Sequence, residues 1–190
     1  ALEPGAVLDF WFSDRARPLW FEKDPAFDDE IRRRFGAAVD AAQAGAFEHW
    51  RETPDGTLAL LILLDQMARN IHRGSPRAFA GDARALAIAM QAAAEGIDRR
   101  FDFASRRFFY LPYEHSEDPK IQERSLALFA DLAATCAPEE KAEADDQYVY
   151  ARRHAEIIER FGRFPHRNDC LGRRCTAEEL EFLAGPNSSF

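Results

Sequence analysis

Four times in this chain, a side chain that can cap a helix stands directly before a proline. The pairs are Asp24-Pro25, Thr53-Pro54, Ser75-Pro76 and Asp118-Pro119. In each pair, the capping oxygen can accept a hydrogen bond from an unpaired backbone amide, and the proline fixes the φ that a first helical turn needs. The pairs therefore mark helix starts, and they predict a chain divided into helices of limited length.

Helix ends and a last helix start are also visible in the sequence. Glycines that can adopt a left-handed cap follow periodic segments at five positions, and Thr176 to Glu179 has the spacing of a capping box. No alternating segment between hairpin turns competes with this pattern. The predicted fold class is all-α, with about seven to eight helices near 4–12, 25–44, 57–72, 82–95, 104–110, 118–135, 138–161 and 177–184. The glycines are Gly45, Gly74, Gly96, Gly162 and Gly185.

The apolar run Leu58–Leu64 indicates where the core lies. These seven residues are apolar on every side of a helix, so this helix is expected to pass through the middle of the fold. The run is much shorter than the roughly 20 residues that a membrane span needs. No Gly/Ser-rich linker divides the 190 residues, so we predict a single helical domain over 1–190.

Charge and cysteine content exclude several classes of protein. The formal net charge of −8 disfavours a general nucleic-acid binder. Three cysteines without Cys-x-x-Cys spacing argue against a disulfide framework and a structural zinc site. No export signal is visible at the amino terminus, so we expect a soluble cytoplasmic protein. Phosphate loops and dinucleotide fingerprints do not occur, so no cofactor is expected.

A first polar cluster, residues 65–73, follows the apolar run. Asp65, Arg69 and His72 share one face of a helix, and Gln66, Asn70 and Arg73 share the adjacent face. Polar groups at the end of a buried helix must be paired or must line a cavity. One interpretation is an Asp65–Arg69 salt bridge with Arg73 capping the helix end, and the other is a ligand site.

A second polar cluster, residues 112–118, is joined by Gln122 one turn into the next helix. Asp118 is predicted to cap that helix. His115 lies in a turn before a helix amino terminus, where it suits anion contact or acid–base work.

The third cluster, residues 160–174, is strongly basic. These fifteen residues contain five arginines and one acid, which gives a formal charge of +4 in an acidic chain. Guanidinium groups suit carboxylate or phosphate, but the same arginines could simply tether an irregular loop to the negative ends of helices. His154, in the preceding helix, is interpreted as a core histidine bonded to a carbonyl. No His-x-x-x-His or Glu-x-x-His spacing supports a metal, which leaves a site assembled from His115, His154 and Glu117 as the alternative.

Together these motifs resemble the bacterial domain-of-unknown-function 924 family. The resemblance rests on Asp65-Gln-x-x-Arg-Asn70, on His115-Ser-Glu-Asp118 and on Gly162-Arg-Phe-Pro-His-Arg-Asn168, and it covers about residues 6–184. The resemblance implies a tetratricopeptide-like helical fold, and it implies no activity.

The favoured functional hypothesis is a pocket for a small anionic molecule, with phosphorylated compounds included. His115 and His166 are the candidates for proton transfer, although neither residue defines a reaction or shows that the protein is an enzyme. The alternative partner is a peptide or protein held by a tetratricopeptide-like module. A third hypothesis is that the clusters form one structural polar network. The predicted ligand-binding residues are Asp65, Gln66, Arg69, Asn70, Arg73, His115, Glu117, Asp118, Gln122, His154, Arg163, His166, Arg167 and Asn168.

Overall fold

The capping side chains predicted from the sequence open helices in the computed structural model, which describes residues 2–190. Asp24, Thr53 and Asp118 each accept a hydrogen bond from a backbone amide two or three residues later, at 2.9, 3.1 and 2.8 Å. Ser75 caps only the short 3₁₀-helix Pro76–Phe79. Thr176 forms the predicted capping box with Glu179.

The described chain is helical and contains no β-strand between residues 2 and 190, so the predicted all-α class is confirmed. The α-helices are α1 (Pro4–Trp11), α2 (Pro25–Gln43), α3 (Pro54–Leu61), α4 (Ala68–Ile71), α5 (Asp82–Ala94), α6 (Phe103–Glu114), α7 (Pro119–Thr135), α8 (Lys141–Phe161) and α9 (Ala177–Ala184). A π-helix, η3 (Ile62–Met67), joins α3 to α4. The 3₁₀-helices are η1 (Arg17–Leu19), η2 (Glu48–Glu52), η4 (Pro76–Phe79), η5 (Asp98–Arg100), η6 (Pro138–Glu140) and η7 (Pro165–Arg167).

Two helix ends differ from the prediction. Helix α6 does not end near residue 110 but continues to Glu114 with Pro112 inside it, because the residues around the proline are buried. Burial outweighs the hydrogen bond that an internal proline removes. Gly185 has a φ of −91° and is not a left-handed cap, whereas Gly162 ends α8 with a φ of +69° as predicted.

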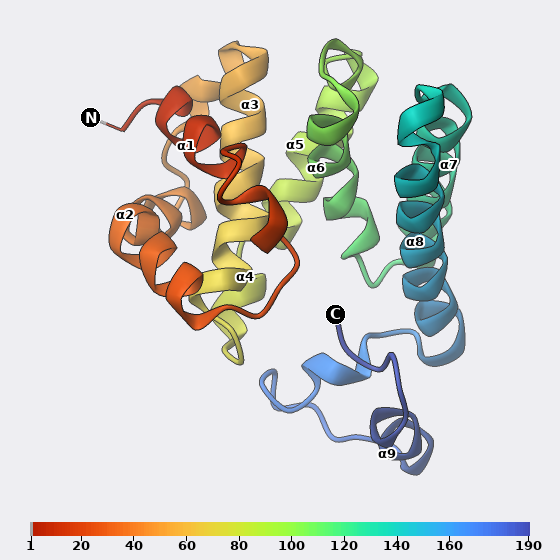
Figure 1. Ribbon diagram of the computed structural model, residues 1–190. Helices are drawn as coiled ribbons and strands as arrows, with labels where there is room; N and C mark the ends of the chain where they lie inside the picture. The colour runs from red at the N-terminus through yellow and green to blue at the C-terminus, as the bar shows by residue number, and fades with distance from the viewer. Residues whose placement is uncertain (1) are drawn as a thin grey trace. The chain divides into compact units, whose positions relative to one another are not determined.

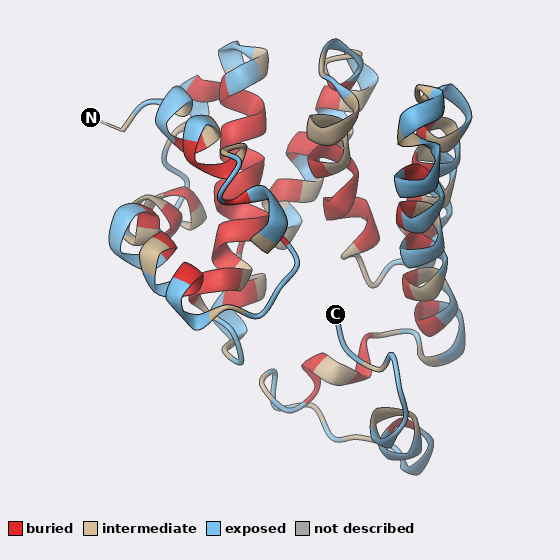
Figure 2. Cartoon of the chain, viewed as in Figure 1, coloured by how far each residue is buried: buried red, intermediate tan, exposed pale blue. Residues whose placement is uncertain are grey.

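Contacts within the chain separate it into two compact units, Ala1–Pro112 and Tyr113–Phe190, which are treated in turn. The first unit is organised around the continuous helix α3–η3–α4, which contacts α1, α2 and α5 (Figure 1). Residues 56–68 are all buried, as the unbroken red segment in Figure 2 shows. The apolar run thus occupies the core, as the sequence predicts. The prediction of a single domain over 1–190 stays a prediction.

The second unit contains the helix pair α7 and α8, whose chain reverses at η6. After α8, the chain forms η7 and then α9, and α9 contacts η7. A small apolar cluster of Ile157, Ile158 and Phe164, extended by Phe161 and Phe182, lies where these elements meet. This apolar cluster holds in place the segment that carries the third polar cluster, residues 160–174.

Within residues 2–190, every helix is too short or too polar to cross a membrane.

Candidate functional site

The first polar cluster is a set of ion pairs inside the first unit. Arg69 donates to Asp65 at 2.8 Å and makes a two-pronged contact with Asp82 at 2.8 and 2.9 Å. Burial acts to lower the pKa of Arg69, but the Asp65 and Asp82 carboxylates outweigh it, so the pKa is raised. Gln66 completes the group by donating to Asp65 at 2.8 Å. The predicted Asp65–Arg69 salt bridge is present.

A second carboxylate, Asp28 of α2, holds the adjacent face of the same helix. Asn70 donates to Asp28 at 2.7 Å, and the Arg73 guanidinium donates to it at 2.6 and 3.2 Å. Arg73 therefore does not cap the helix end as predicted. The Ile71 carbonyl is instead reached by Arg32 of α2, at 3.1 Å. These contacts bind α4 to α2.

The second and third clusters come together in the unit Tyr113–Phe190. The Glu117 carboxylate accepts two hydrogen bonds from the Arg173 guanidinium, at 2.9 and 3.0 Å. It also accepts one from the backbone amide of Phe164, at 2.8 Å. Partial burial acts to raise the pKa of Glu117. The hydrogen bonds from Arg173 and Phe164 act in the opposite direction and outweigh burial, so the pKa of Glu117 is lowered.

Asn168 links this contact to a second ion pair. Its side chain is fully buried, accepts from Arg173 at 2.8 Å and donates to Glu179 at 3.2 Å. Glu179 is in turn held by Arg163 through two hydrogen bonds of 2.7 and 2.8 Å. The side-chain hydrogen bond from Arg163 is the main reason why the pKa of Glu179 falls to about 2, against the opposing effect of burial. We refer to the side chains of Glu117, Arg163, Asn168, Arg173 and Glu179 as the carboxylate network.

Three of the five histidines also gather in this unit. The ring of His154 lies 6.2 Å from that of His115 and 5.5 Å from that of Phe164, and the ring of His166 lies 5.8 Å from Phe164. Phe190 packs on His154 at 3.9 Å and lies 5.9 Å from His166. These five rings are called the imidazole cluster below.

Arg167 borders the imidazole cluster. Its guanidinium lies 4.6 Å from the centre of the Phe164 ring and donates to the carbonyl of His115 at 3.0 Å. The residue is buried, with 7% of its surface exposed. Arg167 thereby joins the turn after α6 to η7, two segments far apart in the sequence.

Buried polar groups hold one imidazole in place. The Nδ1 of His154 lies 2.8 Å from the Tyr150 carbonyl, as predicted for a core histidine, and 2.9 Å from the buried carboxylate of Glu114. Gln122 donates to the Glu114 carbonyl at 2.8 Å and to the Ser116 carbonyl at 2.6 Å. Gln122 thus fixes the turn that carries His115.

The described residues do not bring three His, Cys, Asp or Glu side chains into an arrangement that could hold a metal ion. The alternative metal site of His115, His154 and Glu117 therefore has no geometric support in this part of the chain. Glu117 points its carboxylate at Arg173 and Phe164 instead.

The sequence did not reveal four acidic residues that pair with the predicted arginine, asparagine and histidine side chains. Asp28, Asp82, Glu114 and Glu179 belong to helices other than those of their partners, so no local spacing marks them. Only Glu179 carried a signal, as the last residue of the capping box. Of the predicted residues, Asp65, Gln66, Arg69, Asn70 and Arg73 lie together in the first unit, and the others lie in the second.

The helices and their paired polar clusters define an all-helical protein built on internal ion pairs. The chain belongs to the family of bacterial proteins of unknown function called DUF924, whose model matches residues 7–187. It is also similar to a solved structure of a protein of unknown function from Agrobacterium tumefaciens. The identity is 38% and the TM-score 0.82, over 95% of this chain and 96% of that one. No curated protein matches the chain.

Proposed function

We propose that this protein binds a small anion, phosphate esters included, at the imidazole cluster and Arg167. The observation that carries the proposal is that His154 of α8 lies around the ring of Phe164 together with His166 and Arg167 of η7, and that the ring of His115 lies beside His154. Imidazole and guanidinium groups packed against an aromatic wall are the donors that anion sites use.

The fixed geometry of Arg167 supports this assignment. A guanidinium that lies over an aromatic ring is held by its flat face, and its N–H groups point outward along its own edge, where they can meet phosphate or carboxylate oxygens. The stacking distance of 4.6 Å and the hydrogen bond to the His115 carbonyl orient the group before a ligand arrives. Preorganised donors reduce the entropy that binding costs.

The imidazoles add a proton-transfer capability to the site. Imidazole is the side chain that changes charge near neutral pH, so His115 and His166 are the candidates to exchange a proton with a bound anion. His154 is buried against Glu114 and Tyr150, which suits a positioning role.

The other predicted arginines are assigned a supporting role. Arg69, Arg73 and Arg163 each hold a carboxylate through charge-assisted hydrogen bonds, and displacing that carboxylate would leave a buried charge. We assign Arg163 and Asn168 to holding η7, and thereby Arg167, in position.

Titration with inorganic phosphate, followed by NMR of the histidine ring carbons, tests the proposal. Phosphate at millimolar concentration is expected to shift the His115, His154 and His166 resonances and to leave His49, an exposed histidine of the first unit, unchanged. His166→Gln should raise the Kd about tenfold, which corresponds to one lost charge-assisted contact. His49→Gln is the matched control. Equal shifts at all histidines, or none, would contradict the proposal.

The alternative function is a tetratricopeptide-like module that binds an acidic peptide or protein. One observation favours it: the α7–α8 pair leaves Val149 and Tyr150 exposed on α8, at 42% and 52%. A fluorescent acidic peptide should then bind with a Kd that rises in Tyr150→Ala. Phosphate binding at the imidazole cluster would be unchanged by the same substitution, so the two functions are separable.

A further inference from the structure

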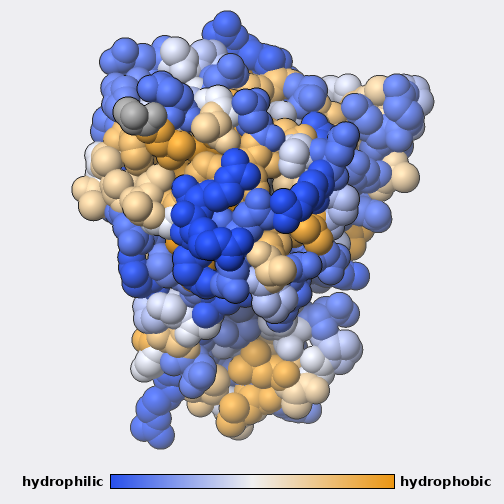
Figure 3. Space-filling view, turned by 60° about the vertical axis from the view of Figure 1, so that its left-hand side comes forward, coloured by the Kyte–Doolittle hydropathy of each residue, from blue (hydrophilic) through white to orange (hydrophobic). Residues whose placement is uncertain are grey.

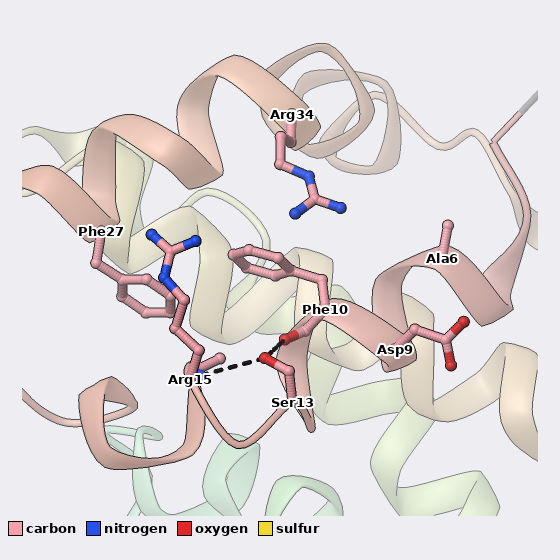
Figure 4. A pocket seen from close by; sticks show the side chains of 8 residues that line it. Ala6, Asp9, Phe10, Ser13, Arg15, Phe27 and Arg34 are labelled. Atoms are coloured by element: carbon pink, nitrogen blue, oxygen red, sulfur yellow. Dashed lines mark hydrogen bonds between the residues drawn. The ribbon is translucent and has the colours of Figure 1, made fainter.

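A hollow of about 470 Å³ opens between α1, α2 and the loop that follows α1. Figure 4 shows the side chains that line it, and Figure 3 shows hydrophilic and apolar side chains mixed on one face of the molecule. None of its residues belongs to the three polar clusters. The lining residues are Ala6, Asp9, Phe10, Ser13, Arg15, Ala16, Phe27 and Arg34.

Two guanidiniums that line the hollow, those of Arg15 and Arg34, share a single carboxylate. Glu30 accepts two hydrogen bonds from Arg15, one of 3.1 Å and one shorter. Arg34 reaches Glu30 only at 3.5 Å. One of the two positive charges is therefore only weakly compensated by Glu30.

Arg34 is held mainly by aromatic faces. Its guanidinium carbon lies 4.6 Å from the centre of the Phe10 ring and 5.3 Å from that of Phe35. In Figure 4 the guanidinium lies above Phe10 and beside the hollow. A guanidinium held by its flat face keeps edge donors for a carboxylate, which it can bind with two parallel hydrogen bonds.

A negative charge also lines the hollow. Asp9 is exposed, and its carboxylate forms no hydrogen bond or ion pair with any of residues 2–190. In Figure 4 it stands on the side away from Arg15. An unpaired carboxylate at this position can accept hydrogen bonds from an ammonium group.

The floor between these charges is aromatic and rigid. Phe10 and Phe27 are both buried, and their rings stack at 5.8 Å with an angle of 14°. Ser13 donates to the Phe10 carbonyl at 2.8 Å and accepts from the Ala16 amide at 3.2 Å, which fixes the loop wall. An apolar group of a ligand would lie on this floor.

We propose that this hollow binds a small zwitterion of the amino-acid type. Arg34 would receive the carboxylate, Asp9 the ammonium, and Phe10 with Phe27 the apolar side chain. The volume falls within the range of about 300–1,000 Å³ that small-molecule sites occupy. The inference is independent of the anion site, because the residues involved lie in the other unit of the chain.

Each of the common L-amino acids is titrated into the protein while NMR follows the backbone amides around the hollow. At least one amino acid is expected to shift the Phe10 and Ser13 resonances. With L-phenylalanine as an example, the intact zwitterion should bind about tenfold more tightly than phenethylamine or 3-phenylpropanoate, which each lack one charge.

Two exposed residues supply the decisive variants. Arg34→Gln should abolish the preference for the carboxylate, and Asp9→Asn should abolish the preference for the ammonium. Arg33→Gln, an exposed neighbour that does not line the hollow, is the matched control and should leave binding unchanged. The absence of a shift with every amino acid, or binding that survives Arg34→Gln unaltered, would overturn the proposal.

Discussion

Asn168 is the residue on which the carboxylate network depends most. Its amide faces Arg173 with its oxygen and Glu179 with its nitrogen, so one side chain satisfies a cation and an anion at once. An amide is suited to this position because it is both donor and acceptor without carrying a charge.

Removing that amide is expected to destabilise the protein. Asn168→Ala removes the acceptor for the Nε of Arg173 and a donor to the Glu179 carboxylate at a fully buried position. We expect this loss to lower the free energy of unfolding by about 2–3 kcal/mol. Urea denaturation measures the change. Asp169→Ala, at the exposed neighbouring position, should stay within about 0.5 kcal/mol of the parent. Equal stability of the two variants would show that the network does not stabilise the fold.

At the scale of helices, the starts were predictable because the signals are local. A capping side chain acts on amides two or three residues away, so Asp24, Thr53 and Asp118 could be recognised without knowledge of the fold. The end of α6 was not predictable in this way, because the burial that carries the helix past Pro112 depends on distant segments.

The cap of α7 provides a test at this scale. Asp118→Ala removes the acceptor for the Lys120 amide and should cost about 1 kcal/mol of stability. Glu123→Ala, an exposed change one turn into the same helix, serves as the control and should be close to neutral. Thermal unfolding compares the two. A neutral Asp118→Ala would mean that Pro119 alone is sufficient to start α7.

For the whole molecule, the candidate site could be predicted only in part. The sequence located the arginines of the candidate site, since Arg69, Arg163 and Arg167 stand in short motifs. It could not locate their partners, because Asp82, Glu179 and the His115 carbonyl are brought near by the fold. The distinction between a ligand site and an internal ion pair depends on those partners, so it was not available from one sequence.

Acid should destabilise the molecule through these carboxylates. The folded-state pKa values of Glu117 and Glu179 are lowered, and that of Glu179 is about 2 against an ordinary value of 4.5. Groups with a depressed pKa stabilise the fold above their unfolded pKa, and this contribution is lost as pH falls through the folded value. Stability measured by circular dichroism should therefore decline between about pH 4.5 and 2.

Glu179→Gln separates this contribution from general acid unfolding. The variant should be less stable than the parent at pH 7, and the difference should shrink as the pH approaches 2. A difference independent of pH would assign the acid transition to other groups.

The π-helix in the middle of the buried helix makes the length of this segment critical. Each residue of an α-helix turns the chain by about 100°. A deletion or insertion within Ile62–Met67 would swing the residues beyond it around the axis by that amount, carrying Asn70 and Arg73 away from Asp28. Substitutions can be absorbed at many positions of a helix, but at this one the count of residues itself is under constraint.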